Sequence, residues 1–249
     1  MQRYFINKNQ IKNNQVIMSI NDSYHIDKVM RMKINDEIVI VVNEVGSFLC
    51  KIIAINQLEV IAELVKPIES NSEMPIEVTI AHGLVRREKM EDTVEKLTEL
   101  GTSAYYPVIM KRSNVKFLEE RFDKRLIRLK KIIKEASEQS HRIRLMDIFM
   151  PITFKELIMM KKHYDYALYA YEEEDKKSTQ FKKIIKALPN NLLVVIGPEG
   201  GFDESEVIEL NQAGFIPISL GPRILRTEVA PLFVLSALSF AFELGKNND

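Results

Sequence analysis

Residues 192–206 have the sequence LLVVIGPEGGFDESE, and residues 215–231 have the sequence FIPISLGPRILRTEVAP. In each stretch a short, mainly apolar run comes before a glycine and a proline, a pattern that predicts a strand followed by a tight loop. The first run is apolar throughout, which is typical of a strand buried on both faces of a parallel sheet. Acidic residues after the first loop predict a helix with Asp203 as its N-cap. The two stretches therefore predict neighbouring strand and loop units of an α/β fold.

The chain from residue 75 to residue 249 alternates predicted strands and helices. Further strands are expected at 76–82, 105–109 and 166–170. Helices are expected at 88–100, 119–139, 154–161, 179–187 and 204–213, followed by a very apolar helix at 229–244. This alternation predicts a mostly parallel sheet that is covered by helices on both faces.

The N-terminal part has a different pattern. Residues 36–65 form short β-branched runs separated by polar breaks at 43–47 and 56–57, which predicts an antiparallel meander or a small barrel. Residues 66–75 contain two prolines, serines and acidic residues, and we interpret them as a linker. The expected domains are therefore residues 1–70 and residues 75–249.

Composition excludes several classes of protein. The chain has 249 residues, of which 46% are hydrophobic and 28% are charged, so it can bury one large or two smaller cores. The single cysteine, Cys50, cannot form an internal disulfide, and the four histidines lack the spacing of metal ligands, so we expect a reducing compartment and no metal. The polar N-terminus lacks the apolar core of a signal peptide, and residues 229–244 are too short for a membrane span, so a cytoplasmic protein is expected.

The two loops of the opening stretches are candidate ligand sites. In parallel α/β sheets ligands bind beyond the carboxyl ends of the strands, and Gly197, Gly200 and Gly201 allow positive φ angles and a close backbone approach. The second loop sets two arginines and a glutamate beside Ile224 and Leu225. The alternatives are a plain tight turn in the first loop, and in the second a turn capped by Thr227 with solvated arginines. Neither loop has a phosphate-binding motif. Two such loops after adjacent strands favour a ligand cleft.

These loops resemble a known family. IGPEGGFDESE and LGPRILRTEVA closely match the two signature loops of the ribosomal RNA small-subunit methyltransferase E family, the 16S rRNA uridine-N3 methyltransferases of the SPOUT class. Similarity extends to residues 95–101, 111–113 and 135–142, and to the N-terminal RYF and residues 25–31. The chain departs from the family pattern at Val229, where threonine is usual, and at Met146, near an expected proline.

The resemblance implies a fold, a cofactor and an assembly. It implies an α/β domain with a trefoil knot, preceded by a small PUA-like β-barrel that binds RNA. It also implies that S-adenosylmethionine binds in a bent shape between the two loops, and that the protein is an obligate homodimer through its C-terminal helix. That helix is apolar on nearly every face, so its apolar side chains must be buried against other protein surface. The cofactor-binding residues implied are Gly197, Pro198, Glu199, Gly200, Gly201, Leu220, Gly221, Ile224, Leu225 and Arg226.

Local segregation of charge predicts an RNA-binding surface, although the formal net charge is zero. The predicted helix 119–139 combines one apolar stripe with many lysines and arginines, which is typical either of a solvated face or of a phosphate-binding surface. Charge and the family resemblance together suggest as RNA contacts Arg3, His25, Lys28, Arg31, Lys33, Arg86, Lys111, Arg112 and Arg142.

The chemistry expected is methylation of uridine N3, which bears a proton and is paired in a duplex, so the reaction requires an accessible or extruded uracil. The hypothesis is that Arg226 stabilises negative charge on the uracil oxygens, and that Glu199, Glu228 or water removes the proton. The competing interpretation puts both loop arginines on phosphates. Three other functions stay open: ribose 2′-O-methylation, a ribosome-assembly factor that binds RNA without catalysis, and a nucleotide-binding enzyme.

Overall fold

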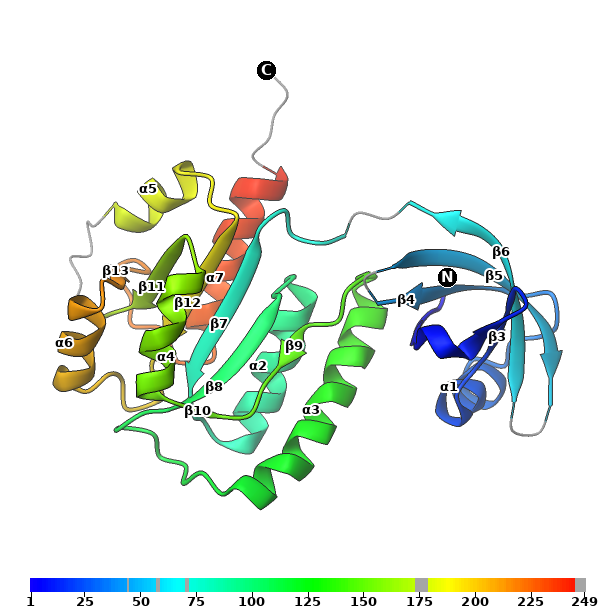
Figure 1. Cartoon of the computed structure of the whole chain (residues 1–249), viewed down its shortest axis with the longest axis horizontal. Coiled ribbons are helices and arrows are strands. Elements are labelled where there is room, and N and C mark those ends of the chain that lie inside the picture. The colour runs from blue at the N-terminus through cyan, green and yellow to red at the C-terminus, as the bar shows by residue number, and fades with distance from the viewer. Residues whose placement is uncertain (44, 57–58, 70–71, 173–178, 245–249) are drawn as a thin grey trace. The chain divides into compact units, whose positions relative to one another are not determined.

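The computed structural model describes residues 1–43, 45–56, 59–69, 72–172 and 179–244 (Figure 1). Contacts divide the chain into two compact units. The first unit contains residues 1–73 together with residues 137–145, and the second contains residues 74–136 and 146–249. The short segment 137–145 thus belongs with the N-terminal unit, an association that the order of the sequence did not predict.

The first unit is built on a six-stranded sheet with the order β1-β4-β5-β6-β3-β2. The antiparallel pairing of β4, β5 and β6 confirms the predicted meander, and β1 adds to it in parallel with β4. The predicted linker is wrong at its start, because β6 continues through Pro67 to Ile68. The strands are β1 (Arg3–Ile6), β2 (Ile11–Lys12), β3 (Gln15–Ile17), β4 (Glu37–Val42), β5 (Gly46–Ile55) and β6 (Val60–Ile68). The helical elements are the turn η1 (Lys8–Gln10), α1 (Ile20–Tyr24) and the π-helical turn η2 (His25–Val29).

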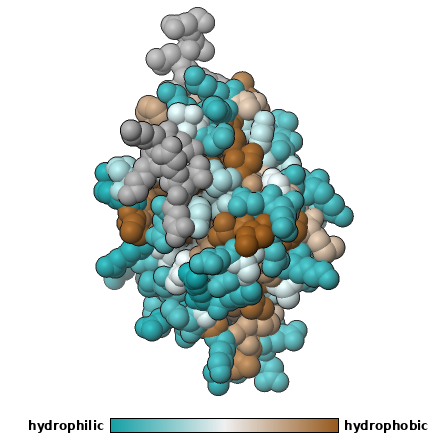
Figure 2. Space-filling model, turned by 90° about the vertical axis from the view of Figure 1, so that its left-hand side faces the viewer, coloured by the Kyte–Doolittle hydropathy of each residue, from teal (hydrophilic) through white to brown (hydrophobic). Residues whose placement is uncertain are grey.

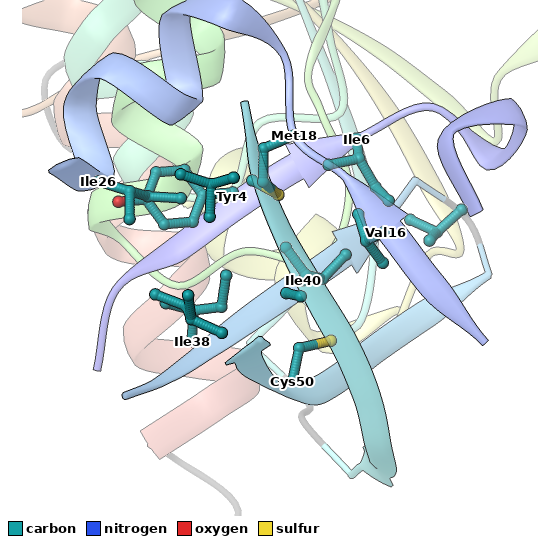
Figure 3. Packing of buried hydrophobic residues seen from close by; sticks show 12 residues of the cluster. Tyr4, Ile6, Val16, Met18, Ile26, Ile38, Ile40 and Cys50 are labelled. Carbon is teal, nitrogen blue, oxygen red and sulfur yellow. The ribbon is translucent and has the colours of Figure 1, made fainter. Parts of the chain in front are cut away.

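Both faces of β4 are buried, which explains why its sequence does not alternate between apolar and polar residues. On one face Ile38 and Ile40 pack with Tyr4 and Cys50 in the main core of this unit (Figure 3). On the other face Val39 and Val41 belong to a smaller cluster with Phe5, Ile143 and Leu145. The segment 137–145 therefore supplies part of the apolar cover of the N-terminal sheet.

Arg142 anchors this segment. Its side chain is buried, with a relative exposure of 2%, and its Nη2 lies 2.6 Å from Oε2 of Glu73. The other oxygen of Glu73 accepts hydrogen bonds from the backbone N–H groups of Ile143 and Arg144. The prediction that Arg142 contacts RNA is wrong, because its guanidinium is buried in an internal ion pair.

The second unit confirms the predicted mostly parallel sheet. All strand pairs in it are parallel, and the order is β10-β8-β7-β12-β11-β13, with β9 also paired to β8. The strands are β7 (Glu77–Gly83), β8 (Ala104–Ile109), β9 (Asp147–Ile148), β10 (Ile152–Thr153), β11 (Tyr166–Ala170), β12 (Asn191–Ile196) and β13 (Ile216–Ile218). The helical elements are α2 (Arg87–Glu99), α3 (Glu119–Gln139), α4 (Phe154–Met160), η3 (Lys161–His163), α5 (Gln180–Lys186), α6 (Glu204–Gln212), α7 (Ala230–Ser239) and the π-helical turn η4 (Phe240–Leu244).

Helices cover both faces of this sheet. Leu193 and Val195 of β12 lie in a core cluster with Leu157 of α4 and Leu210 of α6. Helix α7 contacts β12 and α2, so these two helices cover the opposite face. Strands β12, β11 and β13 are adjacent and parallel, and their carboxyl ends therefore meet at one edge of the sheet.

The apolar segment 229–244 forms a helix that is only partly buried. Val234, Leu235 and Leu238 are fully covered, whereas Phe233 is 40% and Phe240 68% exposed. No helix in the described part of the chain is both long and apolar enough to cross a membrane. The face drawn in Figure 2 is mainly hydrophilic, with hydrophobic residues in separate patches.

Candidate active site

A cleft of about 480 Å³ lies at the carboxyl ends of β11 and β12. Its walls come from the loop after β12, the loop after β13 and the residues that follow β11. A smaller hollow of about 70 Å³ adjoins it and shares Ile224 and Leu225 as lining residues. The structure brings together all ten residues predicted to bind the cofactor. Those in the cleft are Gly197, Pro198, Glu199, Gly200, Gly201, Ile224, Leu225 and Arg226, and those in the hollow include Leu220 and Gly221.

The third wall was missed by the sequence analysis. Ala170, Tyr171 and Glu172 line both the cleft and the hollow. The signal was present, because β11 was predicted to end at Ala170 and the ends of neighbouring parallel strands form one edge. The residues after this strand carry no glycine-rich motif, so nothing in the local sequence distinguished them from an ordinary connection.

The glycines of the first loop act mainly by allowing close approach. Of the three glycines that could adopt a positive φ, only Gly201 does so, at 70°. A Cβ atom on Gly200 would lie 2.9 Å from both Cβ and O of Arg112. At the end of β7, a Cβ atom on Gly83 would lie 2.5 Å from the backbone nitrogen of Pro198. The loop is therefore packed against two other strand ends at distances that only glycine permits.

A buried chain of hydrogen bonds joins the two predicted loops. The Thr227 hydroxyl donates to the Gly197 carbonyl oxygen at 2.6 Å, and its oxygen lies 2.7 Å from Nε2 of His82. Because the hydroxyl proton is used on Gly197, His82 Nε2 must be the donor to Thr227. The other ring nitrogen, Nδ1, then accepts from the Tyr105 hydroxyl at 3.0 Å. Burial lowers the pKa of His82 to about 4, so the ring is neutral near pH 7, as this network requires.

This network replaces the alternative in which Thr227 caps the last helix. Val229 occupies the N-cap position of α7 and makes no side-chain cap. Met146, the second departure, is buried, and its sulfur lies 4.0 Å from the Thr98 hydroxyl. Neither departure lies among the residues that line the cleft.

Lys89 connects the two glutamates that were candidate bases. Its Nζ lies 3.2 Å from Oε2 of Glu228 and 3.6 Å from Oε1 of Glu199. Burial opposes ionisation of Glu228, but a backbone hydrogen bond, Lys89 and Arg226 outweigh it, so the pKa of Glu228 lies below its ordinary value. The second oxygen of Glu199, Oε2, is buried and has no hydrogen-bond partner among the described residues. In the described ranges, no group of three or more possible metal ligands is found.

Glu206 positions the start of α6, a role that the sequence did not reveal. Its buried carboxylate accepts hydrogen bonds from the backbone N–H groups of Lys111 and Asp203, at 2.8 and 2.9 Å. Asp203 caps α6 by accepting from the Ser205 backbone, which confirms its predicted role. The loop after β8 is thereby tied to the glycine loop.

The remaining predicted RNA contacts lie on both units. Arg86, Lys111 and Arg112 are exposed on the second unit, where Asp203 lies 3.7 Å from Lys111 and 3.6 Å from Arg112. On the first unit Arg3 donates to the His141 carbonyl oxygen. The first unit also carries His25, whose Nδ1 lies 3.0 Å from the Tyr4 hydroxyl, and the exposed residues Lys28, Arg31 and Lys33.

Comparisons with known proteins agree with this architecture. Residues 72–239 match the family described as RNA methyltransferase domain, and residues 21–65 match the RNA methyltransferase PUA domain. The chain therefore has the fold of a PUA-linked RNA methyltransferase of the SPOUT class. A relative from Bacillus subtilis, ribosomal RNA small subunit methyltransferase E, is 38% identical over 98% of both chains. This chain belongs to the ribosomal RNA small subunit methyltransferase E family.

Two solved structures extend the comparison to the cofactor. The Neisseria gonorrhoeae member of the family, bound to S-adenosylmethionine, has a TM-score of 0.86 and 27% identity, with 97% of this chain and 98% of that chain covered. A putative methyltransferase from Legionella pneumophila, also with bound S-adenosylmethionine, has a TM-score of 0.84 and 26% identity over 96% and 97% of the two chains.

Proposed function

We propose that this chain transfers the methyl group of S-adenosylmethionine to N3 of a uridine in the RNA of the small ribosomal subunit. The observation that carries the proposal is the cleft at the ends of β11 and β12, in which both family signature loops meet. The names of the related proteins support a small-subunit ribosomal RNA as the substrate. Methylation at N3, the assembled subunit as substrate and a trefoil knot formed by the two loops stay predictions of the family resemblance.

The residues of the cleft fit the proposed cofactor. A volume of about 480 Å³ lies in the ordinary range for small-molecule sites. Phe202, Leu225 and Tyr171 offer apolar surface for an adenine ring, and the glycine loop offers bare backbone for close contact. The unpartnered oxygen of Glu199 is a buried acceptor that suits a cationic ligand. When bound, S-adenosylmethionine supplies a methyl group attached to a positively charged sulfur.

The charged residues around the cleft have distinct proposed roles. Arg226 lines the cleft, and its cation can stabilise negative charge that develops on the uracil oxygens. Glu228 is held ionised beside Lys89, and its lowered pKa makes it a weak base at neutral pH. Glu199 lines the cleft directly, whereas Glu228 does not, so we favour Glu199 as the group that accepts the N3 proton.

Accessible side chains on both units support the proposed partners. The predicted contacts that are at least partly accessible and can meet RNA phosphates are Arg3, His25, Lys28, Arg31, Lys33, Arg86, Lys111 and Arg112, of which Arg112 also lines the cleft. Exposed Phe233, Phe240 and Leu244 near the end of the chain support a homodimer through the C-terminal helix, because isolated apolar surface of this kind is usually covered. Sedimentation of Phe240→Glu tests the dimer, and an unchanged sedimentation coefficient would contradict it.

The decisive experiment is methyl transfer from labelled S-adenosylmethionine to small ribosomal subunits from a strain lacking the homologous enzyme. Nucleosides are then digested and identified by mass spectrometry. We expect 3-methyluridine. A 2′-O-methylated nucleoside would support the alternative SPOUT chemistry, and no transfer despite RNA binding would support a non-catalytic assembly factor.

Arg226→Ala tests the catalytic assignment, with Arg223→Ala as the matched control because Arg223 is exposed in the same loop and lines only the smaller hollow. Loss of one charge-stabilising group should lower kcat by about 100-fold in Arg226→Ala. The control should keep kcat within about threefold, because a phosphate contact affects binding more than turnover. An unchanged kcat in Arg226→Ala at saturating RNA and cofactor would refute the assignment.

A further inference from the structure

A second cavity, of about 570 Å³, lies at the start of α3 and shares no lining residue with the candidate active site. We call it the α3 pocket. It is bounded by Leu84 and Arg87, which follow β7, by residues 115–118 and by the first turns of α3. Its lining contains no acidic residue. The cations that line it are Arg87, Lys116, Arg121, Lys124, Arg125 and Arg128.

Most of these cations have no carboxylate to balance them. Arg87 and Arg128 both contact Glu91, at 2.7 and 3.7 Å. Within the described ranges, no ion pair is formed by Lys116, Arg121, Lys124 or Arg125. The pocket is therefore a concentrated positive region that can attract an anion.

Arg125 is the most informative of these residues. It is half-buried, and its guanidinium carbon lies 5.9 Å from the centre of the Phe122 ring. Burial lowers the pKa of Arg125, with nearby Glu91 and Glu88 opposing the shift. A partly desolvated cation without a carboxylate partner is costly, and an anionic ligand would offset this cost.

Aromatic and apolar side chains complete the pocket. Phe117 and Phe122 lie edge to face, with ring centres 6.0 Å apart. Phe122 is buried, but Phe117 is only partly covered and keeps accessible ring surface beside the cations. Aromatic rings next to lysines and arginines are the combination that binds single-stranded nucleic acid, because the rings stack on bases and the cations meet phosphates.

We propose that the α3 pocket binds one nucleotide of single-stranded RNA, with its base against Phe117 and its phosphates on Lys116, Lys124 and Arg125. An acidic peptide would match the charge but would not use the accessible aromatic ring, so RNA is favoured. The inference rests on the proposed function in one respect, namely that RNA is the substrate. It adds a contact that is separate from the cleft where methyl transfer is proposed.

The test uses the full chain and a fluorescently labelled ten-nucleotide single-stranded RNA, with binding followed by anisotropy at several salt concentrations. Lys124→Glu is compared with Lys130→Glu, which makes the same charge change at an exposed position of α3 outside the pocket. We expect Lys124→Glu to weaken binding about tenfold and to reduce the salt slope by about 0.7 or more. Lys130→Glu should stay within about twofold of the unchanged chain.

Phe117 separates stacking from charge. Phe117→Ala should weaken RNA binding roughly tenfold without a change in salt slope, and Phe117→Tyr should retain affinity, because stacking is independent of counterions. Equal losses for Lys124→Glu and Lys130→Glu would overturn the pocket, as would equally effective competition by polyglutamate. A change in sedimentation of Lys124→Glu without RNA would also overturn it, since a second copy of the chain would then fill the pocket.

Calorimetry with S-adenosylmethionine keeps failure of this inference distinct from failure of the proposed function. All these variants should bind the cofactor normally, because no altered residue lines the cleft. Absence of any binding of the ten-nucleotide RNA by the unchanged chain would also overturn the α3 pocket, whereas methyl transfer to small ribosomal subunits tests the proposed substrate separately. Normal RNA binding by all variants would refute only the α3 pocket. Inorganic phosphate that displaces RNA as effectively as uridine monophosphate would show an anion site without base recognition, which also contradicts the inference.

Discussion

Thr227→Val should uncouple the two loops of the candidate active site. Valine keeps the shape of threonine but lacks the hydroxyl that donates to Gly197 and accepts from His82. His82 is fully buried, so its Nε2–H would lose its acceptor, at a cost of about 1–3 kcal/mol. The Gly197 carbonyl is only part-buried, and losing its donor adds about 1 kcal/mol.

The expected loss is therefore about 2–4 kcal/mol in the free energy of unfolding. For a chain of this size the midpoint of thermal unfolding should fall by roughly 4–16 °C, measured by circular dichroism. The affinity for S-adenosylmethionine should also fall, by about tenfold for each 1.4 kcal/mol needed to reorder the loops. Calorimetry measures that second effect directly.

Thr227→Ser is the matched control, because serine keeps the hydroxyl and loses only a methyl group, worth about 0.8 kcal/mol. Serine should therefore retain most of the stability and of the cofactor affinity. Equal melting temperatures for the valine and serine variants would refute the hydrogen-bond reasoning. A large loss in both variants would instead show that the methyl group, through packing, holds the loops.

Three further predictions concern pH, the glycine loop and the N-terminal unit. Burial depresses the pKa of His82 from 6.5 to about 4, so on acidification the unfolded chain takes up a proton on His82 before the folded chain does. The free energy of unfolding is therefore unaffected by His82 above about pH 6.5 and falls by about 3 kcal/mol as the pH is lowered from 6.5 to 4. Urea unfolding across this range should show the loss, and His82→Gln should flatten it; a parallel pH dependence in both proteins would contradict the assignment. Gly200→Ala should weaken S-adenosylmethionine binding in calorimetry, because its Cβ would meet Arg112 at 2.9 Å, and unchanged affinity would mean that the Arg112 loop yields freely. Arg142→Ala should destabilise the first unit by about 3–5 kcal/mol, because it leaves the carboxylate of Glu73 without its guanidinium partner; hydrogen exchange that is unchanged in residues 137–145 would count against this.

The candidate site could be predicted to a large extent because its signals are local. The run LLVVI is apolar enough to specify a buried strand, and glycines directly after it mark a loop at the strand's carboxyl end. The cleft contains or adjoins every loop residue chosen on this basis. The family resemblance then added the cofactor and reaction, which periodicity and composition do not encode.

Tertiary structure decided the features that depend on distant residues. His82 and Thr227 are 145 positions apart, and the sequence around each gives no sign that they form a hydrogen bond. Glu73 and Arg142 are 69 positions apart, and a surface arginine in a basic stretch has the same local sequence pattern as a buried one. Residues 170–172 became a wall of the cleft only because β11 lies between β12 and β13.

The physical reason for this division is the range of the interactions. Strand, helix and loop preferences arise from neighbouring residues, so the sequence by itself determined the α/β class, most of its elements and the two signature loops. The burial and pairing of a polar side chain depend on which distant segments meet around it. The roles of Arg142, His82, Glu206 and the α3 pocket were therefore fixed only when the chain folded.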